Sequence, residues 1–270
     1  MPSVPRTRNT EPHERELFVA NLTPYELFAL HVGQLKDIVD RSKDIEDEGD
    51  ILPDSAMEVC LIGLVSYFEA FCKHQFAALI NICPPLLEQF AERRSKSSVK
   101  LKDIVLLTPN LERQIGFVIA EQYDFGSPKH INGFFRNLIS VTPFSKDEAH
   151  KYSQLLNDRN LLVHHAGIYT MRYATAQLSR DDLPENLFRN SIVVTREDYF
   201  CWSNFLTKMA VKTIRATTNR LRDFIKQRKI HLPRGKAFAP EYLLVDIDIS
   251  IAEILQMKKA SEKKRTPKVI

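Results

Sequence analysis

The sequence predicts an all-α protein, and three observations point to that fold class. The 270-residue chain contains only 8 glycines, and dipeptides typical of turns are scarce. Several long segments carry apolar residues at helical spacing, and two of them begin with a capping-box pattern. Because 44% of the residues are hydrophobic, the chain can bury a sizeable core. We therefore expect a helical bundle of four to five principal helices.

The first two principal helices are predicted from their starts and their apolar content. Thr23-Pro24 supplies an N-cap and a first-turn proline, and the helix that follows reaches the charged segment 41–50. The second helix begins at Asp54 or Ser55 and runs to about Ile82, and apolar residues lie on almost all of its sides. Such a helix is central in a bundle, so we expect the others to surround it.

Residues 83–145 are less regular, and we interpret them as a helical or irregular insertion within the domain. Pro84-Pro85 ends the preceding helix and opens a short one from Leu86 to about Arg94. Further short helices are expected over 110–121 and 131–139, separated by loops.

The third principal helix is predicted from a capping box and a terminating glycine. Ser145 and Glu148 have the spacing in which each side chain caps the backbone near the other. The helix is expected to run to His165, because Gly167 suits the left-handed position just past a helix end.

The fourth principal helix is predicted in the same way. Thr195 and Asp198 cap a helix that runs to about Lys229. Between the third and fourth helices, residues 168–177 alternate weakly, which leaves a strand or an irregular segment open. Residues 191–195 could pair with them in a small β-hairpin.

The ends of the chain and its cysteines bound its class. Residues 1–14 are expected to be a disordered tail, 15–230 the helical domain, and 231–270 an extension with a basic tail. The polar start does not resemble a signal peptide, and no apolar run is long enough to span a bilayer. The four cysteines lack metal-ligand spacing and are interpreted as buried, reduced thiols. We therefore expect a cytoplasmic protein that needs no metal, no cofactor and no membrane.

The segment from Asn157 to Gly167 combines an arginine, an amide and two histidines at a predicted helix end. Arg159 can bind a phosphate through two N–H groups. His164 lies in the last turn, where free carbonyls favour a cation, so it is suited to donate or accept a proton. Asn160 shares a face with His164, but Arg159 and His164 point roughly 140° apart around the helix. A joint site is therefore expected to need a second copy of the chain.

The spacing Arg-x4-His is weak evidence by itself. Residues 8–13 match it too, in a proline-containing segment that cannot form a helical site. An ordinary helix end remains open as an alternative, with Arg159 in a surface ion pair with Asp158 or Glu69. Glu69 could equally pair with Lys73 on its own helix.

The segment RNLLVHHAG, which starts at Arg159, resembles the signature of the HEPN superfamily, all-α domains with an Arg-x4–6-His motif. The segment LVSYFEAFCKHQF, which contains Glu69, is similar to the companion helix of that family. The resemblance covers residues 15–230, mostly through these two helices. It implies that Arg159 and His164 form a catalytic pair supported by Asn160 and Glu69. His165 stands where related motifs often have asparagine, so either histidine could be the active one.

The resemblance also implies a function. Active members of the family are metal-independent endoribonucleases, which here would mean attack by the RNA 2′-hydroxyl, leaving a 2′,3′-cyclic phosphate and a 5′-hydroxyl. They dimerise so that two motifs line one cleft, and many act as toxins or in antiviral defence. RNA, a second copy of the chain and a neutralising or regulatory protein are the implied partners. Inactive members serve as interaction or nucleotide-binding modules, which is the alternative function.

Residues 212–236 form a basic segment, with nine Lys or Arg and the single acidic residue Asp223. Five of the basic residues fall near one helical face and could follow an RNA backbone. The alternative is a solvated helix face. The five residues are Lys212, Arg215, Arg222, Lys226 and Lys229.

Overall fold

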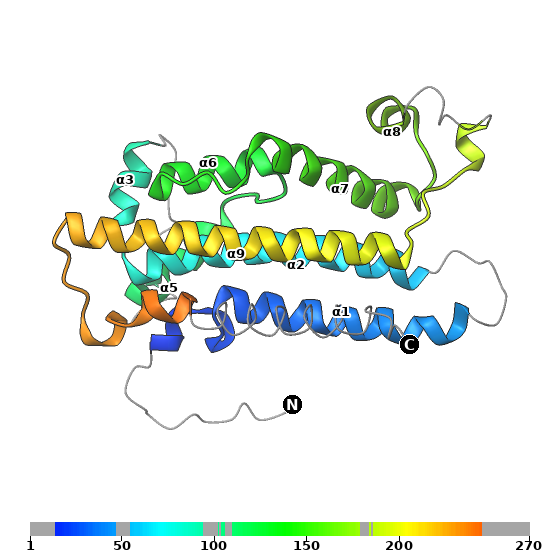
Figure 1. The fold of residues 1–270 in the computed structure, drawn as a ribbon. Helices are drawn as coiled ribbons and strands as arrows, with labels where there is room; N and C mark the ends of the chain where they lie inside the picture. Colours follow the sequence, from blue (N-terminus) through cyan, green and yellow to red (C-terminus); the bar gives the residue numbers. More distant parts are fainter. Residues whose placement is uncertain are drawn as a thin grey trace, which may run out of the picture.

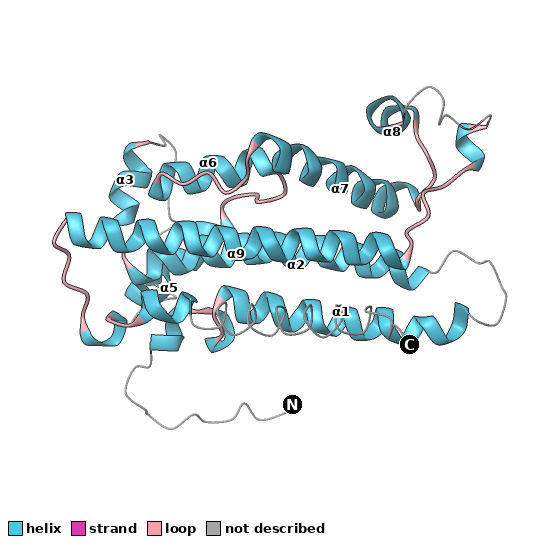
Figure 2. Ribbon diagram, viewed as in Figure 1, coloured by secondary structure: helices cyan, strands magenta, loops and turns pink. Residues whose placement is uncertain are grey.

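The computed structural model describes residues 14–46, 55–93, 102, 104–105, 110–178, 184 and 186–244, and these form an all-α bundle (Figure 1). In these ranges no β-strand forms, and only an isolated antiparallel bridge joins Ile168 to Ser191 (Figure 2). The expected tails lie outside the described residues, except for Glu14 and the part of the extension up to residue 244. The helices are η1 (Glu14–Leu17), η2 (Val19–Asn21), α1 (Pro24–Glu46), α2 (Ser55–Ile82), α3 (Leu86–Glu92), α5 (Leu111–Glu121), α6 (Pro128–Ile139), α7 (Lys146–His165), α8 (Met171–Gln177), η3 (Leu187–Arg189), α9 (Arg196–Gln227) and η4 (Arg234–Lys236).

The four principal helices α1, α2, α7 and α9 begin where the sequence predicts. The capping boxes at Ser145 and Thr195 both form, with the side chain and the backbone of each cap bonded to the third helical residue. Thr23 makes the same reciprocal contact, since its Oγ1 accepts from the Glu26 N–H at 3.1 Å and its N–H donates to the Glu26 carboxylate at 2.6 Å. Local caps therefore determine where α1, α7 and α9 start.

Helix α2 is the centre of the bundle, as predicted. It contacts α1, α5, α7 and α9. In Figure 1, α1 lies on one side of the α2–α9 pair, and α6 and α7 lie on the other. Phe68 of α2 is fully buried and meets the ring of Tyr152 of α7 edge-on at 5.3 Å. This aromatic contact fixes the face of α7 that turns toward α2.

The insertion contributes to the same core. Helix α5 lies so close to α2 that a Cβ atom added at Gly116 would lie 2.2 Å from the Ala77 carbonyl oxygen. The Gly116 N–H donates to Asn81 Oδ1 at 2.8 Å, which ties the two helices together. Helix α6 begins at Pro128, earlier than predicted, because Ser127 caps it by accepting from the His130 N–H. Most of the predicted loop between α3 and α5 lies outside the described residues.

The segment after α7 differs from the prediction. A strand was one expectation for residues 168–177, but Met171–Gln177 forms helix α8. Thr170 caps this helix by accepting from the Tyr173 N–H at 3.2 Å. The expected β-hairpin with residues 191–195 is therefore reduced to the single bridge at Ile168. The threonine cap outweighs the weak alternation of residues 168–177.

Two further expectations can be compared with the structure. No helix within the described ranges is both long enough and apolar enough to pass through a membrane. Cys60, Cys72 and Cys83 are buried free thiols as predicted, whereas Cys201 is exposed, so the prediction of burial is wrong for it. Cys201 follows the first turn of α9 on the side that faces solvent.

The candidate functional site at the end of α7

Helix α7 ends in a left-handed turn that directs the chain away from the bundle. Ala166 and Gly167 have φ values of 50° and 77°, so the prediction for Gly167 is confirmed and the left-handed region begins one residue earlier. The Gly167 N–H donates to the Leu161 carbonyl at 3.2 Å. Its own carbonyl accepts from the Ile192 N–H at 2.9 Å, which holds the two chain segments together. The turn therefore places α8 beside the last turns of α7.

Arg159 lies on the inner side of α7 and is used in packing. Its Nη2 donates to Glu69 Oε1 at 2.7 Å, and its Nη1 donates to Asn160 Oδ1 at 3.1 Å. Both charged side chains of this pair are about one fifth exposed, at 21% and 23%. The Arg159 Nε is buried and has no hydrogen-bond partner within the described part of the chain. The open alternative of a Glu69 ion pair is thus what forms, and neither Asp158 nor Lys73 takes that place.

The surroundings of Glu69 are tightly packed. Burial raises the pKa of the Glu69 carboxyl above its ordinary value, while the Arg159 guanidinium partly offsets the rise. A Cβ atom added at Gly126 would lie 3.5 Å from Glu69 Oε1, so the loop before α6 lies near the Glu69 carboxylate. The Tyr152 hydroxyl is buried next to this pair and has no partner in the described ranges. This inner site is therefore a partly buried polar contact between α2 and α7.

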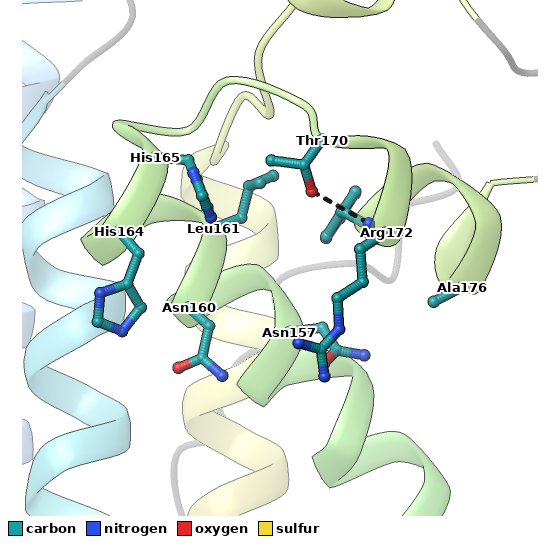
Figure 3. A pocket seen from close by; sticks show the side chains of 9 residues that line it. Asn157, Asn160, Leu161, His164, His165, Thr170, Arg172 and Ala176 are labelled. Atoms are coloured by element: carbon teal, nitrogen blue, oxygen red, sulfur yellow. Dashed lines mark hydrogen bonds between the residues drawn. The ribbon is translucent and has the colours of Figure 1, made fainter.

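The outer side of the same helix end carries an open pocket of about 230 Å³, which we call the α7–α8 pocket (Figure 3). His164 and His165 line it, and both are exposed. Asn160 also lines it and thus touches both sides, since its Oδ1 binds Arg159. Arg159 itself is not a lining residue. The lining residues are Asn157, Asn160, Leu161, His164, His165, Thr170, Arg172, Tyr173 and Ala176.

Helix α8 is held against α7 by a partly buried polar contact. The Tyr173 hydroxyl donates to Asp158 Oδ1 at 2.7 Å. Burial raises the pKa of the Asp158 carboxyl, and the Tyr173 hydrogen bond partly offsets the rise. The ring of Tyr173 also stacks on Tyr169 at 5.6 Å with an interplanar angle of 11°. These contacts fix α8 relative to α7, and Figure 3 shows Arg172 extending from α8 toward the α7 residues.

The structure therefore brings together three of the five predicted site residues, Asn160, His164 and His165. Arg159 and Glu69 do not line the pocket; they pair with each other, and Arg159 reaches the pocket residues only through its hydrogen bond to Asn160. Sequence reasoning missed Arg172 and Tyr173, because it left residues 168–177 as a strand or an irregular segment. The signal that could have found them is Thr170, an N-cap residue before a run that can form a helix.

The predicted basic face of α9 is exposed but lies away from this pocket. Its first residue, Lys212, pairs with Glu148 in the first turn of α7. His164 lies 16 residues further along α7, which is about 24 Å at the rise of an α-helix. Arg215, Arg222 and Lys226 follow Lys212 further along α9, and Arg222 pairs with Glu241 at 3.2 Å. A ligand in the pocket would need to extend along the bundle to reach them. Of the five predicted residues, Lys212, Arg215, Arg222 and Lys226 lie on α9, whereas Lys229 follows the end of the helix with a left-handed φ of 51°.

The α7–α8 pocket thus combines two imidazoles, two amides and a guanidinium. These groups can exchange protons and bind an anion, which are the elements of phosphoester chemistry. No group of three potential metal ligands of the His, Cys, Asp or Glu type occurs within the described ranges. No family model, curated protein or solved structure matches this chain.

Proposed function

We propose that the protein is a metal-independent endoribonuclease of the HEPN type, with His164 and His165 as its acid–base groups. The observation that carries the proposal is that both histidines line one open pocket, together with Asn160. The resemblance of RNLLVHHAG to the HEPN signature supports the same reaction. The roles as a cytoplasmic toxin or defence effector, the homodimer and the neutralising partner rest on that resemblance.

The proposed reaction needs a base, an acid and a cation. His164 accepts the proton of the RNA 2′-hydroxyl while that oxygen attacks the adjacent phosphorus. The bond from phosphorus to the 5′-oxygen breaks, and protonated His165 gives its proton to the leaving oxygen. The products are a 2′,3′-cyclic phosphate and a 5′-hydroxyl. Two imidazoles in one pocket can supply both proton transfers, because histidine exchanges protons near neutral pH.

The alternative is a non-catalytic nucleotide-binding or interaction module that uses the same pocket. One observation favours it: Arg159, which the family resemblance assigns to catalysis, is bound by Glu69 and does not line the pocket. A pocket that retains histidines without the motif arginine could bind a nucleotide without cleaving it.

The experiment that separates the two functions is an RNA cleavage assay in EDTA. Wild-type protein is compared with His164→Ala and His165→Ala, and cyclic phosphate ends are measured on tRNA, rRNA and mRNA. His150→Ala is the matched control, because His150 is an exposed histidine in the first part of the same helix. We expect His164→Ala to lose about 100-fold or more of the cleavage rate, and His165→Ala to lose less.

The outcomes are distinct. Cleavage that persists unchanged in both histidine variants would assign the activity to something other than this pocket. No cleavage of any RNA by folded wild-type protein would favour the binding module. A larger loss in His165→Ala than in His164→Ala would exchange the roles of the two residues.

A further inference from the structure

The α7–α8 pocket contains a cation that sequence reasoning did not assign. Arg172 lies in α8, is exposed, and lines the pocket together with His164 and His165. No ion pair or side-chain hydrogen bond holds its guanidinium within the described part of the chain. Its N–H groups are therefore available to an anion.

The guanidinium of Arg159, in contrast, is already bound by other side chains. Its two terminal nitrogens donate to Glu69 and Asn160, and its Nε is buried. To bind a phosphate, Arg159 would have to leave a partly buried carboxylate, which is costly because an unpaired buried charge is strongly unfavourable. The positive charge of Arg159 is thus already neutralised, whereas that of Arg172 is not.

The charged side chains that line the pocket also favour an anion beside Arg172. The lining contains one arginine and two histidines, and it contains no aspartate or glutamate. The nearby Asp158 is not a lining residue, and its Oδ1 accepts from the Tyr173 hydroxyl. The end of α7 carries partial negative charge, which repels an anion, so an unpaired cation is needed to bind one here.

We propose that Arg172 binds the phosphate group of a ribonucleotide in this pocket, and that Arg159 is a positioning residue that orients Asn160. The ribonucleotide as ligand rests on the proposed function; the phosphate contact rests on the pocket itself. Through the Tyr173–Asp158 hydrogen bond, α8 holds Arg172 at a fixed place relative to the histidines of α7. The guanidinium can then donate two parallel hydrogen bonds to two phosphate oxygens.

The test measures binding rather than cleavage. Adenosine 3′-monophosphate is titrated into the full chain and followed by NMR of the histidine rings, with adenosine and inorganic phosphate as separate probes. The variants are Arg172→Gln, Arg159→Gln and the control Arg136→Gln, an exposed arginine on α6. Circular dichroism confirms that each variant is folded.

We expect Arg172→Gln to raise the Kd for adenosine 3′-monophosphate about ten- to hundredfold, because a charge-assisted contact is lost. Adenosine should bind equally to this variant and to wild type. Arg136→Gln should leave the Kd unchanged, and Arg159→Gln should lower the unfolding midpoint while changing the Kd less than about threefold.

Several results would overturn the proposal. An unchanged Kd in Arg172→Gln, or no binding by wild type, would remove Arg172 from the site. A large loss in folded Arg159→Gln would return the phosphate contact to Arg159. Inorganic phosphate that binds as tightly as the nucleotide would replace the ribonucleotide site with a simple anion site. Binding that depends on Arg172 in a protein that cleaves no RNA would support this inference while the endoribonuclease proposal fails.

Discussion

The two sides of the end of α7 differ in how they use their polar residues. On the inner side, Arg159 and Glu69 bind each other and join α7 to α2. On the outer side, His164, His165 and Arg172 are exposed around an open pocket. The comparison shows that residues of one short motif can serve different purposes, because a helix turns its successive residues toward different environments. The inner side stabilises the bundle, and the outer side is available to a ligand.

The largest effect on stability is expected from breaking the inner pair. Arg159→Gln leaves the partly buried Glu69 carboxylate without the cation that offsets its burial, so we expect the free energy of unfolding to fall by about 2 kcal/mol. Urea denaturation measures this change. The double variant Glu69→Gln/Arg159→Gln should lose less than the sum of the two single variants. If the losses of the two single variants added exactly in the double variant, Arg159 and Glu69 would have no interaction energy.

The turn between the two sides offers a matched pair of substitutions. Gly167→Ala places a side chain at a φ of 77° and should destabilise the protein by about 1 kcal/mol. Ala166→Gly removes a side chain from a φ of 50° and should stabilise it by about 0.5 kcal/mol. Chemical denaturation tests both. The same sign for the two changes would contradict the left-handed geometry of this turn.

The position of α8 gives a pH-dependent prediction. The pKa of Asp158 is raised in the folded protein, so the ionised carboxylate costs stability. The folded state is therefore favoured most at pH values below the pKa of Asp158 in the unfolded chain. This stability is lost as the pH rises through the pKa in the folded protein. Tyr173→Phe removes the hydrogen bond that lowers this pKa. The variant should therefore be less stable than wild type at pH 7, by up to about 1 kcal/mol. The difference should shrink as pH approaches the ordinary aspartate value, which unfolding curves at several pH values can measure. A difference independent of pH would mean that the hydroxyl does not act through Asp158.

The smallest effect is expected from the basic face of α9, which is distant from the pocket. Lys226→Ala and Lys229→Ala should each weaken RNA binding about twofold. Each should also reduce the slope of log Kd against log salt concentration by about one. Fluorescence anisotropy at several salt concentrations measures both quantities. Losses as large as that of Arg172→Gln would show that this face, and not the pocket, dominates RNA binding.

Much of the fold could be predicted because its signals are local. Thr23, Ser145 and Thr195 each cap a helix through a residue three positions later, so the chain carries the information within one turn. The apolar residues on all sides of the second principal helix predicted its central place, because such a helix must be surrounded. For residues 168–177 the sequence left a strand or an irregular segment open, and both were wrong for Met171–Gln177, because the only local signal for that helix is the single cap residue Thr170.

The candidate site was predicted only in part, for a physical reason. The sequence by itself determined that His164 and His165 lie at a helix end, since the caps and the glycine that define that helix are local. Only the tertiary structure decided the partner of Arg159, because Glu69 is 90 residues away and meets it through the packing of α7 on α2. The tertiary structure likewise placed Arg172 in the lining of the same pocket as the histidines, because the left-handed turn and the Tyr173–Asp158 contact hold α8 against α7. Helical periodicity fixes the face on which a residue lies, but contacts between helices decide what that face meets.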